Sequence, residues 1–182
     1  VVETNSADEE AVLDLQQVCI PLVEDRRESG LMHNKFVVID RAWVWTGSWN
    51  LTENGTYRNN NVAVLIASPA LADNYTTEFE EMLGGAFGPT SPAGTPNPRI
   101  MIEMEDGQKP VLVDNYFAPE DKAATHIIAE LESAQARIRF MAFTFTSRAI
   151  ADAMLDRARA GVVVQGVIED RNAESDYSQY DR

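Results

Sequence analysis

A histidine and a lysine two residues apart are the clearest candidates for chemistry: His33 and Lys35, in the segment LMHNKFVVID. This segment is rich in β-branched and aromatic residues, which predicts a strand over residues 31–40. Because side chains two apart on a strand leave the same face, we expect the imidazole and the ammonium group to lie side by side. A nucleophilic imidazole beside a fixed positive charge is suited to an anionic substrate such as a phosphate ester.

A hydroxyl and an amide follow at the same spacing. Ser48 and Asn50, in the run GSWN, could both donate hydrogen bonds to a phosphate that Lys35 neutralises and His33 attacks. Such charge stabilisation requires no metal ion. One cysteine and two histidines at unrelated positions are also too few for a Cys/His zinc site. We therefore expect no metal and no cofactor.

The spacing of these residues forms a longer pattern. It reads His-x-Lys, four residues, Asp, six residues, and then Gly-Ser-x-Asn, which resembles the signature of the phospholipase D superfamily. The resemblance implies a role for each matching position. His33 would be the nucleophile or the acid/base, Lys35 and Asn50 would bind phosphate, and Ser48 would be a supporting donor.

Two further positions take their roles from the resemblance alone. Asp40 is counted with the catalytic residues by its place in the signature, although in the family this aspartate usually supports the structure of the motif. Family members often carry an acid that orients the histidine where this chain has three consecutive asparagines, ending at Asn61. We take Asn61 as the equivalent. Its amide can hydrogen-bond an imidazole but cannot balance imidazolium charge, which argues against His33 as a strong base.

Phospholipase D-type enzymes, as the resemblance implies, combine two such motifs, so that one histidine attacks and the other protonates the leaving oxygen. These 182 residues contain one motif. We expect the second to come from a missing part of a longer chain or from a homodimer partner, and the 182 residues alone to be inactive unless they pair. The expected activity is cleavage of phosphodiesters, preferably phospholipids, through a phosphohistidine. A nuclease of the same superfamily and a non-catalytic phosphate-binding or scaffold module stay open as alternatives.

The net charge and the composition of the chain limit the kinds of partner that it can bind. Lys and Arg number 15 against 29 Asp and Glu, which gives a net charge of -14 and disfavours binding to nucleic acid. The single cysteine, Cys19, lies in an apolar stretch, so we expect a small buried hydrophobe. No apolar run approaches the roughly 20 residues that span a bilayer, and none has the pattern of a signal peptide. The chain begins with Val1 rather than Met, and its compartment stays open, a secreted or envelope location included.

The run GGAFGPTSPAGTPNPR, residues 84–99, is a Gly/Pro-rich linker by composition. The resemblance implies that residues 1–83 are the C-terminal half of one phospholipase D-like domain. Residues 100–182 would then be the N-terminal half of a second, truncated before its own His-x-Lys motif. We expect an α/β fold in which helices flank a mixed sheet.

The elements expected before the linker are a helix, a strand, a polar loop, a hairpin with a tight turn at Asp40-Arg41, a further strand and a helix capped by Ser68. Their ranges are 9–18, 20–23, 24–30, 31–40 with 42–45, 61–67 and 69–83. The last helix would bury Leu71, Tyr75, Phe79, Met82 and Leu83. Trp43, Trp45 and Trp49 either line a substrate cleft or pack against the sheet.

After the linker we expect two strands, a helix, a strand–helix–strand unit and a polar tail. Their ranges are 100–103, 110–116, 119–134, 137–146, 147–160, 162–169 and 170–182. A strand–helix–strand unit of this kind implies a parallel strand pair with a right-handed crossover.

Overall fold

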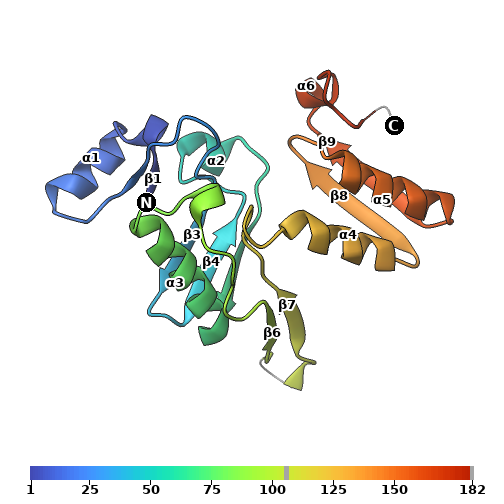
Figure 1. Cartoon of the computed structure of the whole chain (residues 1–182), viewed down its shortest axis with the longest axis horizontal. Helices are drawn as coiled ribbons and strands as arrows, with labels where there is room; N and C mark the ends of the chain where they lie inside the picture. The colour runs from blue at the N-terminus through green and yellow to red at the C-terminus, as the bar shows by residue number, and fades with distance from the viewer. Residues whose placement is uncertain (105–106, 181–182) are drawn as a thin grey trace. The chain divides into compact units, whose positions relative to one another are not determined.

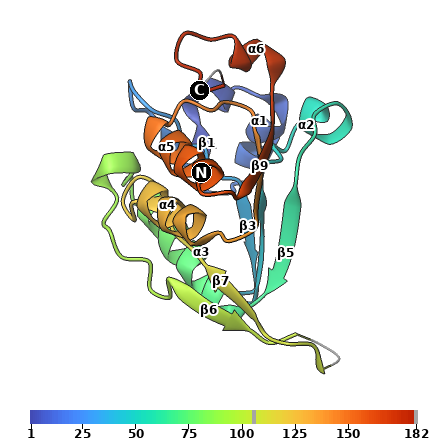
Figure 2. The same ribbon diagram turned by 90° about the vertical axis from the view of Figure 1, so that its right-hand side faces the viewer.

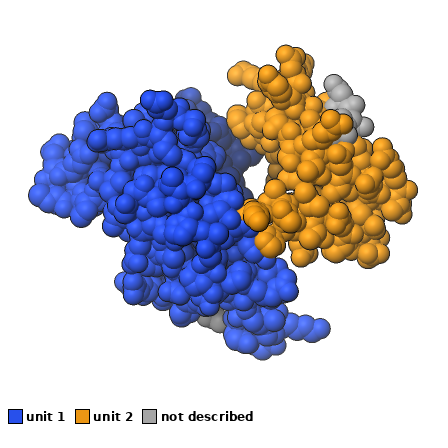
Figure 3. All heavy atoms as spheres, viewed as in Figure 1, with its two compact units in different colours: residues 1–121 blue, residues 122–182 orange. Residues whose placement is uncertain are grey.

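The computed structural model describes residues 1–104 and 107–180 and is a mixed α/β structure, as expected. The chain divides into two compact units, Val1–Asp121 and Lys122–Arg182 (Figure 3). This division by compactness differs from the two partial domains expected on either side of residues 84–99, which stay a prediction.

A three-stranded antiparallel sheet forms the centre of the first unit, in the order β3-β4-β5. Its strands are β3 (Phe36–Ile39), β4 (Trp43–Gly47) and β5 (Ala63–Ala67). Helix α3 (Pro69–Leu83) contacts β3 and β4 (Figures 1 and 2). The helix begins where predicted, because the Ser68 hydroxyl accepts a 3.2 Å hydrogen bond from Leu71 N.

The core of this unit joins the sheet, α3 and a later hairpin. Val44 is 0% exposed, Leu71 2% and Ile100 6%. Ile100 lies on β6 (Arg99–Ile102), which pairs with β7 (Val111–Asp114) in antiparallel register. Burial of these side chains therefore attaches the strands that follow residues 84–99 to the first unit.

A buried asparagine ties the expected linker down as well. Asn74, on α3, is 0% exposed, and its amide nitrogen donates to Asn97 O at 2.8 Å and to Asn115 Oδ1 at 2.9 Å. Its amide oxygen accepts from Asn97 N at 2.8 Å. The 84–99 segment also contains a short 3-10 helix, η2 (Gly88–Thr90). The segment is therefore ordered on the first unit near its end, rather than a free connection.

The N-terminal region differs most from expectation. A short parallel pair joins β1 (Val2–Glu3) to β2 (Glu24–Asp25), so the strand lies in the expected loop and not at residues 20–23. Between them lie η1 (Thr4–Ser6) and α1 (Glu10–Gln17). The expectation of a buried Cys19 was wrong: this residue is exposed and has a φ of 61° in the turn that follows α1.

The second unit is built around the expected strand–helix–strand motif. Strands β8 (Arg137–Ala142) and β9 (Val163–Ile168) are parallel, and α5 (Arg148–Arg159) connects them. Helix α4 (Ala123–Ser133) precedes the motif and α6 (Asp170–Ala173), which was not expected, follows it. Ile138, Met154 and Val162 form its core. Within residues 1–104 and 107–180, no helix combines the length and apolarity needed to span a bilayer.

Candidate active site

The segment that carries His33 and Lys35 is not a strand. Residues 31–35 lie outside regular secondary structure, and β3 begins only at Phe36, so the alternation of a strand does not place these two side chains. Hydrogen bonds to side chains hold the segment instead of a sheet ladder. They run from Met32 N to Glu3 Oε2 (2.9 Å), from Asn34 Nδ2 to Glu78 Oε1 (2.9 Å) and from Thr46 Oγ1 to Lys35 O (3.1 Å).

His33 and Lys35 nevertheless interact. Lys35 Nζ donates a 2.8 Å hydrogen bond to the carbonyl oxygen of His33. Loss of solvent around the imidazole lowers the pKa of His33, and the positive charge of Lys35 lowers it further. Burial also lowers the pKa of Lys35. At neutral pH the imidazole is therefore unprotonated beside an ammonium group, which is the state a nucleophile requires.

Ser48 lies where β4 ends, and its partners are all on the segment that leads into β5. Its backbone N donates to Val62 O at 2.9 Å, while its hydroxyl accepts from Val62 N at 3.0 Å and donates to Asn61 Oδ1 at 3.0 Å. The Ser48 hydroxyl group thus already donates its one hydrogen bond, to Asn61. To donate to a phosphate, as the sequence suggested, Ser48 would have to release this bond.

The side chain of Asn61 links Ser48 to the helix that precedes the 59–61 segment. Its amide nitrogen donates to Gly55 O at 2.9 Å, within α2 (Glu53–Tyr57), a short helix that the sequence reading missed. Thr52 caps this helix by accepting from Gly55 N at 3.0 Å. Both ends of the Asn61 amide therefore have partners, Ser48 and Gly55. The orientation of His33 by Asn61 stays a prediction.

Trp45, Trp49 and Asn50 flank Ser48 in the sequence. Asn50 is exposed, and its backbone carbonyl oxygen accepts a hydrogen bond from Thr52 N at 2.7 Å. The rings of Trp45 and Trp49 meet edge to face with centroids 5.2 Å apart, and Trp49 Nε1 donates to Thr56 Oγ1 at 3.2 Å. Of the two readings offered by the sequence, these contacts favour packing for Trp45 and Trp49.

Asp40 does not lie with the other candidates. It occupies the turn at the far end of β3, where Asp40 and Arg41 have φ values of 52° and 54° and Ala42 N donates to Ile39 O at 3.0 Å. Asp40 is five positions after Lys35, which corresponds to about 16 Å along an extended chain. The turn confirms the predicted hairpin. It also places Asp40 at the opposite end of β3 from Lys35, and a catalytic role for Asp40 stays a prediction.

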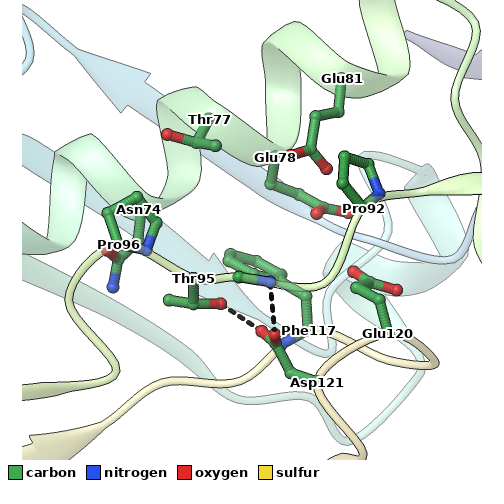
Figure 4. A pocket seen from close by; sticks show the side chains of 11 residues that line it. Asn74, Thr77, Glu78, Glu81, Pro92, Thr95, Pro96, Phe117, Glu120 and Asp121 are labelled. Atoms are coloured by element: carbon green, nitrogen blue, oxygen red, sulfur yellow. Dashed lines mark hydrogen bonds between the residues drawn. The ribbon is translucent and has the colours of Figure 1, made fainter.

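An acidic pocket next to the motif segment was missed by the sequence reading. Glu78, Glu81, Glu120 and Asp121 line it together with residues of the 92–96 segment (Figure 4). Glu78 is only 6% exposed and accepts the hydrogen bond from Asn34. Burial, and next the charge of Glu120, raise the pKa of Glu78 to about 7. The signal available in the sequence was helical spacing, since Leu71, Asn74 and Glu78 share one stripe of α3.

Asp121 has the opposite environment in the same pocket. Burial opposes its ionisation, but backbone N–H groups of Phe117 and Gly94 donate to it at 3.0 and 3.3 Å, as does the Thr95 hydroxyl, and the pKa of Asp121 is lowered overall. Figure 4 shows this carboxylate turned towards Thr95. Asp121 therefore fastens the 94–95 segment as an anion, whereas Glu78 favours the neutral form.

A neutral imidazole beside an ammonium group is chemically suited to attack and bind a phosphate ester. In the part of the chain that the structure describes, no group of three or more His, Cys, Asp or Glu side chains is placed to hold a metal ion.

Comparison with known families identifies the segment that carries these residues. Residues 2–83 match the family described as cardiolipin synthase, PLD-like domain. The match covers the His-x-Lys segment, the Gly-Ser-x-Asn run and α3. A comparison with curated proteins finds no match. Over residues 2–83 the chain is therefore similar to a PLD-like domain, and this similarity supports membership of the phospholipase D superfamily.

Proposed function

We propose that the chain provides one half of a phosphodiesterase active site that works through a phosphohistidine. A nitrogen of the neutral His33 imidazole attacks phosphorus, and the bond from phosphorus to the leaving oxygen breaks. Lys35 neutralises a non-bridging oxygen, and Asn50 donates to the same phosphate. Water then attacks phosphorus and the bond to His33 breaks. The observation that supports this most directly is the pKa of His33, which burial and the charge of Lys35 keep low.

A second histidine has to protonate the leaving oxygen, because it departs with a negative charge. The 182 residues hold one His-x-Lys pair. We infer that the second motif comes from another part of the parent chain or from a second copy of this one. The strand–helix–strand unit within residues 100–182 supports the first source, because it has the form expected for the opening of a second domain.

The substrate class we propose is a phospholipid. A net charge of -14 disfavours a long polyanion, whereas a single phosphodiester needs only the local charge of Lys35. The description of the matched family names cardiolipin, which is a phospholipid. Cleavage of an oligonucleotide in preference to phospholipid vesicles would instead support the nuclease reading.

The test is hydrolysis of bis(4-nitrophenyl) phosphate and of phosphatidylcholine vesicles by the full chain, over a hundredfold range of protein concentration. If two copies pair, the rate rises with the square of the concentration. His33→Ala should abolish turnover and the acid-labile, alkali-stable phosphoryl adduct. His126→Ala, at the other histidine of the chain, should change neither. Equal turnover in wild type and His33→Ala would rule out the mechanism.

A non-catalytic phosphate-binding module is the second candidate. Asn61 supports it, because an amide stands where the family often has a carboxylate, and its partners are Ser48 and Gly55. This reading predicts that phosphate esters bind, that binding is lost in Lys35→Ala but not in Lys109→Ala, and that no hydrolysis occurs at any protein concentration. Turnover that depends on His33 would exclude it.

A further inference from the structure

Two buried carboxyl groups meet in the acidic pocket. Glu78 comes from α3 and is 6% exposed. Both carboxylate oxygens of Glu120 are buried, and within the described residues no N–H or O–H group donates a hydrogen bond to them. Glu120 faces Glu78 within hydrogen-bonding reach, and Figure 4 shows both side chains directed into the same pocket. Each carboxylate is thus an acceptor opposite another acceptor.

Such an arrangement is costly if both groups are ionised. Two negative charges in a poorly solvated pocket repel, and the Glu120 oxygens would lack any donor. One proton between the two groups removes one charge and gives Glu120 its missing donor. The donor set does not suit a cation instead, because within residues 1–104 and 107–180 no three metal-binding side chains are suitably grouped.

We propose that Glu78 and Glu120 share one proton and that Glu78 is thereby a positioning residue for the segment that carries His33 and Lys35. The link is Asn34, which lies between these two residues in the sequence and donates from Nδ2 to Glu78 Oε1 at 2.9 Å. Its consequence for catalysis rests on the proposed function. The shared proton itself does not.

The geometry assigns each oxygen of Glu78 a task. In the protonated form, the carbonyl oxygen accepts from Asn34 while the hydroxyl donates to Glu120. When the proton leaves, Glu78 and Glu120 repel each other, and α3 and the 117–121 segment no longer hold Asn34 in one place. The segment of residues 31–35, which has no sheet ladder of its own, then loses one of the three side-chain hydrogen bonds that hold it.

The surroundings of Glu78 make this proton leave close to neutral pH. Burial and the charges of Glu120 and Glu81 raise the pKa of Glu78 to about 7, although the hydrogen bond from Asn34 opposes the rise. The titratable Tyr75 also faces it from α3. Asp121 acts on Glu81, and the pocket residues from the 92–96 segment are uncharged.

The direction of the pH effect follows from linkage. An ordinary glutamate has a pKa of 4.5 and Glu78 in the folded chain about 7, so the folded state binds more protons between these values. The stabilisation is complete below pH 4.5 and is lost as the pH rises to about 7. The difference corresponds to a change on the order of 100-fold in the folding equilibrium constant.

The test compares Glu78→Gln, Glu120→Gln and Glu80→Gln in the full chain. Glutamine mimics a protonated glutamate, so Glu78→Gln should accept from Asn34, donate to Glu120 and reduce the loss of stability between pH 5 and 8 at least tenfold. Glu80 is an exposed residue of the same helix, and its variant should keep the wild-type profile. Urea unfolding at several pH values provides the equilibrium constants.

Carboxyl-carbon NMR titration gives a second, independent measurement. One glutamate of the wild type should titrate near pH 7, and in Glu120→Gln, whose amide donates to Glu78, this titration should move below pH 6. The His33 ring resonances should show an inflection near pH 7 that disappears in Asn34→Ala. Wild-type glutamates that all titrate below pH 5.5, or an unchanged stability profile in Glu78→Gln, would overturn the shared proton.

These measurements need no substrate. If the titration is as expected and the His33→Ala variant turns over substrate like the wild type, the proposed function fails while the carboxyl pair stands. If the titration is as expected but the His33 inflection survives in Asn34→Ala, the positioning role is refuted. If the near-neutral titration is missing while turnover depends on His33, the carboxyl pair fails and the proposed function stands.

Discussion

The backbone of Val62 passes so close to Gly47 that a β-carbon on Gly47 would lie 2.1 Å from the Val62 carbonyl oxygen. The same carbonyl accepts the hydrogen bond from Ser48 N. No side chain can be accommodated there without separating β4 from the segment that leads into β5. The glycine of the Gly-Ser-x-Asn run is therefore required by packing.

Gly47→Ala should destabilise the chain by roughly 2–4 kcal/mol, because the clash is with backbone and the strands must move apart. Urea denaturation at pH 7 measures the loss. Gly85→Ala is the matched control: Gly85 has a φ of +89° and open space around it, so alanine there adds backbone strain without a clash. We expect it to cost only about 1 kcal/mol. Equal effects of the two substitutions would contradict the close approach.

Asn61→Asp should destabilise the Ser48–Asn61–Gly55 connection by about 1–2 kcal/mol. The carboxylate can still accept from the Ser48 hydroxyl, but it cannot donate to Gly55 O and instead repels that oxygen. Asn60→Asp, at the preceding exposed residue, controls for the added charge and should be close to neutral. An Asn61→Asp variant as stable as Asn60→Asp, with a raised pKa of His33, would show that residue 61 acts on the histidine instead.

Arg27 is partly exposed and forms an ion pair with the buried carboxylate of Asp25, so Arg27→Ala should cost about 2–3 kcal/mol at pH 7. Asp25 is 2% exposed, and Arg27 NH2 lies 2.6 Å from Asp25 Oδ2. Removal of the arginine leaves a buried carboxylate without its main partner. Arg26→Ala is the control, because Arg26 pairs with Glu24 on the surface, and it should cost less than about 0.5 kcal/mol.

The same pair predicts a pH effect of known sign. The hydrogen bonds from Arg27 are the main cause of the lowered pKa of Asp25, which burial opposes. Stability from the pair is present above the ordinary value of 3.8 and is lost as the pH falls through the lower pKa of the folded state. In Arg27→Ala, the ionisation of Asp25 should contribute a smaller loss of folding stability when the pH is lowered. A wild-type acid profile in the variant would refute the pairing.

The elements that the sequence predicted well are those with local signals. Ser68 caps α3 as expected, α5 lies within the expected range 147–160, and parallel β8 and β9 flank α5 as the apolar periods indicated. The turn at Asp40 was likewise visible as a break between two apolar runs. Caps, turns and periodicity depend on neighbouring residues, so one sequence is enough to read them.

The features that the sequence did not predict depend on contacts between residues that are distant in the chain. The motif segment looked like a strand because of its composition, yet residues 31–35 are held by Glu3, Thr46 and Glu78. The buried face of α3 was expected to be apolar throughout. Instead Asn74 and Glu78 are buried while Phe79 and Leu83 are 38% and 37% exposed. Buried polar groups are stable only with partners, and the partners of Asn74 lie more than twenty residues away.

The sequence indicated which residues form the candidate site, but not how their side chains are arranged. Spacing selected the candidate residues, and the family match over residues 2–83 supports the superfamily assignment. The position of Asp40 in a turn and the hydrogen bonds of Ser48 to Val62 and Asn61 follow from how β4 and β5 meet, which no local pattern encodes.

Lys35→Ala should raise the pKa of His33, because the neighbouring positive charge that disfavours the imidazolium is removed. The rise should stop short of the ordinary value of 6.5, since burial is the larger cause of the lowering and persists in the variant. Proton NMR titration of the ring resonances measures the change, with His126 in α4 as an internal reference. Lys109→Ala controls for the loss of one positive charge from the chain.

The acid limb of kcat/KM should move to higher pH in the same variant, because a larger fraction of His33 is protonated and unable to attack at a given pH. The loss of phosphate neutralisation should lower kcat/KM at all pH values by about 10²-fold or more, in line with the removal of a charge that stabilises the transition state. An unchanged His33 titration in Lys35→Ala would mean that the two side chains do not lie together, and the proposed attack on phosphorus would then lack the cation that it requires.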